Sequence, residues 1–195
     1  MAKAENFSAK YFEGMSKTMQ EVDHQEVDKM VNIILEAHQN NKQIFVFGNG
    51  GSASTASHFG CDLGKGAAVK GVRRLRIMSL NDNIAHFSAI ANDLGYENVF
   101  LEQLKNLMNN GDVVIGITVS GNSENIIKAF EYAKEKKAFT VGWIGNKGGK
   151  LLKFCDAAVV VSSGDFGLVE SLHMILEHLV AHCVRERLEQ SVPHQ

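Results

Sequence analysis

The sequence is poor in proline and cysteine: its 195 residues include one proline, Pro193, and three cysteines. Because proline interrupts helices, a chain without internal proline can form long continuous helices, and its 18 glycines must supply the turns. Cys61, Cys155 and Cys183 are odd in number and widely separated, with no Cys-x-x-Cys pair. This pattern favours a reducing, cytoplasmic environment over a disulfide scaffold. Cys61 is expected to be a small buried apolar side chain rather than a nucleophile.

The sequence also lacks a charge excess and long apolar runs. Its 20 Lys and Arg residues against 22 Asp and Glu give a net charge of −2, so charge predicts neither a nucleic-acid nor a membrane-surface partner. No apolar run approaches the roughly 20 residues that span a bilayer, and the N-terminus lacks the apolar core of a signal peptide. The length and the ordinary composition predict one globular domain over residues 1–195.

The apolar pattern predicts an α/β fold. Residues 1–40 are predicted to contain two amphipathic helices, packed either on the domain's own core or in an oligomer interface. Five short apolar runs follow, alternating with helical segments, and runs that are apolar on both faces are typical of buried parallel strands. The sequence therefore predicts a three-layer αβα sandwich with a five-stranded parallel sheet, preceded by two N-terminal helices. The expected strands are 43–48, 75–80, 112–120, 139–145 and 156–163, and the expected helices are 53–64, 84–92, 98–109, 123–136, 148–154 and 167–189.

Ligands of open parallel sheets bind at the carboxyl ends of the strands, and a glycine-rich loop, GNGGSAS (48–54), follows the first strand. Its glycines permit close backbone approach, and the next helix presents free N–H groups. The loop also matches the dinucleotide pattern G-x-G-x-x-A, which requires an acidic residue about 20 positions later. Residues 66–70 contain no such residue. An anion site and a tight turn without a ligand both remain open for this loop.

A second polar loop, TVSGNSEN (118–125), follows another predicted strand. The hydroxyl groups of Thr118, Ser120 and Ser123 flank a glycine ahead of a helix, an arrangement that can hold a phosphate with neutral donors. Ser123 has the alternative role of capping that helix. Two such loops at neighbouring strand ends predict a small phosphorylated ligand.

Several motifs together resemble the sugar isomerase (SIS) domain family over essentially the whole chain. They are GNGGSAS, HFGCDL, AIANDLGYENVF, SGNSENI and a final helix with Glu and His eight residues apart. His58 and AIANDLGY are similar to the phosphoheptose isomerase branch. The resemblance implies an aldose–ketose isomerase that converts sedoheptulose 7-phosphate to D-glycero-D-manno-heptose 7-phosphate through an enediol. It also implies one divalent metal ion in each subunit, which is zinc in the family. The assembly that it implies is a homotetramer with active sites near the subunit interfaces.

The resemblance also assigns roles by position. It implies catalytic roles for Asp62, Glu170 and His178, with either carboxylate as the base and His178 as the acid partner. Asp62 stands where the family has glutamate, Glu170 where it has glutamine, Val119 where it has threonine, and Gly167 where an aspartate often precedes the last helix. The implied metal ligands are His58, Asp62, Glu170 and His178. The implied substrate contacts are Asn49, Gly50, Gly51, Ser52, Asp62, Asn92, Asp93, Thr118, Val119, Ser120, Ser123 and Glu170.

Residue spacing supports part of this metal site. His58 and Asp62 are four residues apart, so they share one helix face, and imidazole with carboxylate suits zinc. Glu170 and His178 are eight residues apart, which is about 12 Å of helical rise and roughly 80° of rotation. Both reach one ion only with extended side chains. Otherwise one of them belongs to a neighbouring subunit's site or has a different role.

Other functions remain open at this point. A non-catalytic SIS binding module, of the type that associates with the replication initiator DnaA, is one alternative. An isomerase for a different sugar phosphate is another, and a sugar-phosphate-sensing regulator is a third. The ionisable side chains at all four metal positions favour the enzyme.

Overall fold

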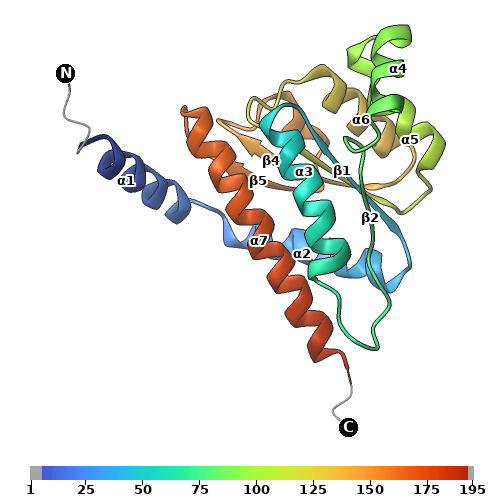
Figure 1. Ribbon diagram of the computed structural model, residues 1–195, viewed down its shortest axis with the longest axis horizontal. Helices are drawn as coiled ribbons and strands as arrows, with labels where there is room; N and C mark the ends of the chain where they lie inside the picture. The colour runs from blue at the N-terminus through green and yellow to red at the C-terminus, as the bar shows by residue number, and fades with distance from the viewer. Residues whose placement is uncertain (1–5, 193–195) are drawn as a thin grey trace.

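An open, five-stranded parallel sheet lies at the centre of the computed structural model, which describes residues 6–192 (Figure 1). The strand order is β2-β1-β3-β4-β5, and every neighbouring pair is parallel. This confirms the predicted sheet, although the limits of the predicted domain, residues 1 and 195, and Pro193 lie outside the described residues. The strands are β1 (Gln43–Gly48), β2 (Arg76–Ser79), β3 (Val113–Thr118), β4 (Phe139–Gly145) and β5 (Ala157–Val161).

Helices cover both faces of the sheet, as the three-layer prediction requires (Figure 1). One core contains Phe59 and Trp143, and the other contains Phe47, Phe100 and Phe130. The first face carries α2 (His24–Gln39), α3 (Gly51–Cys61) and α7 (Phe166–Gln190), with α1 (Phe7–Gln20) beyond α7. The second face carries α4 (Ile84–Leu94), α5 (Leu101–Leu107) and α6 (Glu124–Glu135). The predicted helix 148–154 is a 3₁₀ segment, Gly149–Phe154.

The two N-terminal helices differ in how they pack. Helix α2 buries Met30, Val31 and Ile34 in the domain's own core. Helix α1 lies against α7, where the Tyr11 hydroxyl is 3.1 Å from the Ser171 hydroxyl. It leaves its aromatic side chains Phe7 and Phe12 75% and 70% exposed.

Helices α3 and α7 lie side by side and run in the same direction (Figure 1). Asp165 caps the start of α7, because its carboxylate accepts hydrogen bonds from the backbone N–H groups of Gly167 and Leu168. The expected end of α3 at residue 64 is wrong. The α-helical part ends at Cys61, and a π-helical turn, Asp62–Gly66, follows it directly. The expectation that Cys61 is buried is also wrong, because its side chain is exposed on the last turn of α3.

Disulfides and membrane-spanning helices are both missing from the described part of the chain. All three cysteines are free thiols, as expected. No helix between residues 6 and 192 combines the length and the apolar character needed to cross a membrane.

Candidate active site

The two polar loops meet because they leave adjacent strands. Gly48 at the end of β1 is in register with Ile117 near the end of β3, and the direction of the strand order reverses between these two strands. Such a switch point is where open α/β sheets bind ligands. The first loop depends on its leading glycine, because a Cβ atom on Gly48 would lie 2.6 Å from the carbonyl oxygen of Ser52. In the second loop Gly121 has a φ of +65°, a conformation that side chains disfavour.

A cavity of about 160 Å³ opens between the two loops and the start of α7. It is smaller than the roughly 300–1,000 Å³ of a complete ligand pocket, so it suits one end of a substrate rather than the whole. The N-termini of α3 and α6 flank it, and helix N-termini attract anions. Its lining residues are Asn49, Ser52, Ile117, Thr118, Val119, Ser120, Ser123, Phe166 and Glu170.

The hydroxyl groups of the second loop shape this cavity. Thr118 Oγ1 accepts a hydrogen bond from the backbone N–H of Gly121 and lies 3.5 Å from the hydroxyl oxygen of Ser123. Ser123 occupies the N-cap position of α6, but within the described chain its side chain makes no capping hydrogen bond. Its hydroxyl group is therefore free to donate to an anion in the cavity.

A carboxamide network joins the two loops. The side chains of Asn49 and Asn125 donate to each other's oxygen atoms at 3.0 and 2.9 Å, and the Tyr96 hydroxyl donates to Asn49 Oδ1 at 2.8 Å. Asn49 also borders a second cavity of about 290 Å³, which Tyr96 lines as well. Sequence reasoning missed Asn125 and Tyr96 as functional residues, although both lie inside the motifs that carry the family resemblance.

Glu170 lies in the wall of the first cavity, against the start of α3. A Cβ atom on Gly51 would be 2.6 Å from both carboxylate oxygens of Glu170, so only glycine permits this contact. The positive end of the α3 dipole stabilises a negative charge at this position. The structure therefore places Glu170 with the residues expected to bind substrate.

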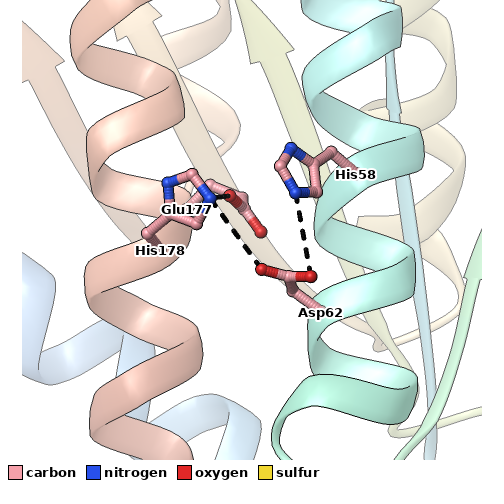
Figure 2. Close-up of side chains that lie close together, drawn as sticks. All are labelled: His58, Asp62, Glu177 and His178. Carbon is pink, nitrogen blue, oxygen red and sulfur yellow. Dashed lines mark ion pairs between the residues drawn. The ribbon is translucent and has the colours of Figure 1, made fainter.

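A second group of ionisable residues lies farther along the same two helices (Figure 2). His58 and Asp62 come from α3 and the turn after it, and Glu177 and His178 come from α7. One ligand atom from each of the four lies within 4.8 Å of the others. Asp62 is 3.7 Å from His58 Nε2 and 4.0 Å from His178 Nε2. Two imidazoles and two carboxylates suit a divalent metal ion such as zinc.

The structure brings three of the four expected metal ligands together with Glu177, whereas Glu170 lies apart from them. His58, Asp62 and His178 come together, whereas in residues 6–192 the group takes in Glu177 and not Glu170. Sequence reasoning missed Glu177. The available signal was an acidic residue on the apolar face of α7, one turn after the buried His173 and beside the buried Leu176.

Burial dominates the electrostatics of this group. Glu177 is 0% exposed, and burial raises the pKa of its carboxyl group. The neighbouring His178 and His58 lower this pKa, and the Asp62 carboxylate raises it further. His178 Nε2 lies 3.4 Å from Glu177, yet the carboxylate oxygens have no hydrogen-bond partner in the described chain. The π-helical turn begins at Asp62, one of the four residues of this group. It is closed by a hydrogen bond of 2.7 Å from the Ala67 N–H to the Asp62 carbonyl oxygen. Such turns are frequent at functional sites.

Two residues expected to bind substrate lie apart from both groups. Asn92 and Asp93 are exposed on α4, and Asn92 Nδ2 donates to Asp93 Oδ1 at 2.8 Å. Neither side chain lines the two cavities described above.

Comparisons with known proteins find matches over most of the chain. The family model described as "SIS domain" matches residues 10–145. A phosphoheptose isomerase from Helicobacter pylori (strain ATCC 700392 / 26695) is 40% identical over 154 residues, covering 79% of this chain and 80% of that protein. One from a Nitratiruptor species is 39% identical over 154 residues, 79% of this chain and 82% of the relative. The solved phosphoheptose isomerase from Neisseria gonorrhoeae superimposes with a TM-score of 0.86 at 27% identity, covering 93% of this chain and 98% of that one.

Proposed function

Because the chain belongs to the SIS domain family and, within it, to the phosphoheptose isomerases, we propose that the cavity at the carboxyl ends of β1 and β3 is its active site. The chain is an aldose–ketose isomerase, and its reaction interconverts sedoheptulose 7-phosphate and D-glycero-D-manno-heptose 7-phosphate. The relatives are named as isomerases, so the non-catalytic binding module is not favoured.

One observation carries this proposal: residues of the hydroxyl-rich loop, residues of the glycine-rich loop and Glu170 line a single cavity. Ser52, Ser120 and Ser123 offer neutral donors beside two helix N-termini, which suits a phosphate group. Val119 contributes no hydroxyl where the family has threonine, so this chain relies on the remaining donors.

Isomerisation of the ketose requires a base that removes a proton from C1, beside the carbonyl carbon C2, and returns it to C2, while the C1 hydroxyl proton passes to the C2 oxygen. Glu170 has this role in our proposal, because its carboxylate lies in the cavity wall at the start of α7 and is held against Gly51. Binding of the phosphate orients the reacting carbons beside that carboxylate, so that binding energy is used for positioning. Asn49, fixed by Asn125 and Tyr96, lines the same cavity.

A divalent metal ion, zinc by family habit, belongs to the same proposal. The residues present fit such an ion, since the group offers imidazole and carboxylate donors and includes buried carboxylate oxygens without a hydrogen-bond partner in the described residues. His58, Asp62 and His178 would hold it, which gives Asp62 and His178 a ligand role in place of the base and acid roles expected from the sequence. When bound, the ion would supply a fixed positive charge between α3 and α7.

Assembly and location complete the proposal. We expect a homotetramer in the cytoplasm, without nucleic-acid or membrane partners, in which residues 1–195 form one SIS domain. Exposed aromatic side chains on α1 support an interface between subunits. The exposure of Asn92 and Asp93 on α4 is consistent with contributions to a neighbouring subunit's site.

Incubation with sedoheptulose 7-phosphate, followed by detection of the aldose, tests the reaction. Glu170→Gln is expected to lower kcat by about 10²–10⁴-fold, the usual contribution of a general base. Glu186→Gln, an exposed position on the same helix, is the matched control and should leave the rate unchanged. If both Glu170→Gln and Asp62→Asn retain full turnover, the site is wrongly assigned. If the wild-type protein forms no aldose with or without added zinc, the binding module becomes the better explanation.

A further inference from the structure

Glu177 is a buried carboxylate that takes no part in the proposed isomerisation. It is fully buried on α7, and neither oxygen has a hydrogen-bond partner among residues 6–192. Burial of an uncompensated carboxylate is costly, and a buried charge is normally paired or bound to a metal ion. Its neighbours along the buried face of α7, including Leu172, Leu176 and Val180, are mostly apolar, so packing alone would favour an apolar residue here.

The direction of this carboxylate accounts for its presence. One of its oxygens lies 3.4 Å from His178 Nε2, and an oxygen of Glu177 falls within 4.8 Å of the ligand atoms of His58 and Asp62 (Figure 2). Four ligands at about 2.0–2.1 Å from a tetrahedral zinc ion are roughly 3.4 Å from one another. The observed separations of 3.4, 3.7 and 4.0 Å require only a small inward movement of side chains.

The alternative fourth ligand, Glu170, is positioned differently. It precedes His178 by eight residues, about 12 Å along α7. Its carboxylate contacts Gly51, which precedes His58 by seven residues on the parallel helix α3. Glu170 is therefore two turns from the group on both helices.

We propose that Glu177 is the fourth ligand of the metal ion, so that His58, Asp62, Glu177 and His178 of one subunit form the complete site and Glu170 remains outside it. Two carboxylates and two neutral imidazoles carry a charge of −2, which balances a divalent cation. This inference deepens the proposed function, on which it rests for the metal, by identifying the ligands. It separates the ion from the carboxylate that acts on the substrate.

Metal affinity tests this assignment directly. Full-length wild-type protein, Glu177→Gln and the matched control Glu170→Gln are depleted of metal and titrated with Zn²⁺ in competition with a chromophoric chelator. The wild type and Glu170→Gln should each bind one Zn²⁺ per chain with the same affinity. Glu177→Gln should bind it at least about 10–100-fold more weakly, since even residues behind the ligands contribute that much. At the same Zn²⁺ concentration, the Tm of the first two proteins should rise more than that of Glu177→Gln.

Two further measurements protect the test against a folding defect. Glu177→Leu replaces the buried carboxylate with an apolar side chain, so the metal-free variant should fold at least as well as the wild type and still bind Zn²⁺ more weakly. A crystal structure of the zinc-loaded wild type needs no variant: a Glu177 oxygen within about 2.2 Å of the ion supports the assignment.

Three results would overturn the assignment: an unchanged affinity in Glu177→Gln, a wild-type protein that binds no Zn²⁺, or Glu170 at the ion in the crystal structure. The isomerase assay on the same samples keeps the two proposals apart. Zinc bound through Glu177 without aldose formation would refute the proposed function alone. Aldose formation with zinc bound through Glu170 would refute this inference alone.

Discussion

His173 shows how much a single buried residue on α7 can affect stability. It is 0% exposed and lies near Trp143, with ring centroids 6.4 Å apart and the rings tilted by 38°. Neither ring nitrogen has a hydrogen-bond partner in the described chain. Burial lowers the pKa of this imidazole to about 4, against about 6.5 in an unfolded chain. Between these two values the unfolded state binds more protons than the folded state. The unfolding free energy is therefore unaffected by this group above pH 6.5, and it decreases as the pH falls from 6.5 toward 4.

Replacement of His173 by leucine should remove this pH dependence. At pH 5 the wild-type protein should have lost about 2 kcal/mol of unfolding free energy relative to pH 7 through this group alone. The loss of unfolding free energy between pH 7 and pH 5 should be smaller by this amount in His173→Leu, because the variant has no imidazole to protonate. At pH 7 the variant should be at least as stable as the wild type. Urea unfolding at both pH values measures the difference. The exposed His182, changed to leucine, is the control, and an unchanged pH profile in His173→Leu would contradict the account.

Single residues also mark the limit of what sequence could predict at the site. The four-residue spacing of His58 and Asp62 was sufficient to place them together, because helix geometry fixes neighbours on one face. The role of Glu177 could not be predicted in the same way. Its burial depends on which side of α7 faces α3 and the sheet, and that is decided by packing between distant parts of the chain. The exposure of Cys61 was missed for the same reason.

At the scale of elements, the start of α7 determines where Glu170, Glu177 and His178 lie. Asp165 accepts hydrogen bonds from Gly167 N at 2.8 Å and Leu168 N at 3.2 Å, which satisfies two of the free N–H groups of the helix. The sequence drew attention to Gly167, where the family often has aspartate. The acidic residue that caps the helix stands two positions earlier.

Loss of this cap should weaken the whole domain. Asp165→Ala is expected to lower the unfolding free energy by about 1 kcal/mol, the usual value of an N-cap. For a chain of this length that corresponds to about 2–4 °C in Tm, measurable by circular dichroism. Asp165→Ser, which retains a capping oxygen, should recover most of the loss. Equal melting of Asp165→Ala and the wild type would show that the cap contributes nothing.

Element types were largely predictable, and element ends were not. Strands β1, β3 and β4 are apolar on both faces, so composition alone identified them. The π-helical turn at Asp62–Gly66 could not be predicted, because a 3.6-residue pattern does not reveal an extra residue in a turn. That turn is where the predicted helix and the true α3 diverge.

At the scale of the whole molecule, α1 is poorly covered by the rest of the described chain. Met15 and Thr18 are buried, and Tyr11 contacts Ser171 of α7. Phe7 and Phe12 remain mostly exposed. Exposed aromatic side chains on one projecting helix are typical of an interface with another subunit, which agrees with the proposed homotetramer.

A charge at Phe12 should therefore weaken assembly without unfolding the subunit. Phe12→Glu removes an aromatic contact, worth about 2 kcal/mol where it is central to an interface, and this corresponds to a roughly 30-fold higher dissociation constant. Light scattering coupled to size-exclusion chromatography should give the mass of a tetramer for the wild type and smaller species for Phe12→Glu at the same concentration. Phe12→Tyr retains the ring and should assemble normally. A monomeric wild type, or a Phe12→Glu protein that stays tetrameric on dilution, would remove α1 from the interface and leave its exposed phenylalanines without a role.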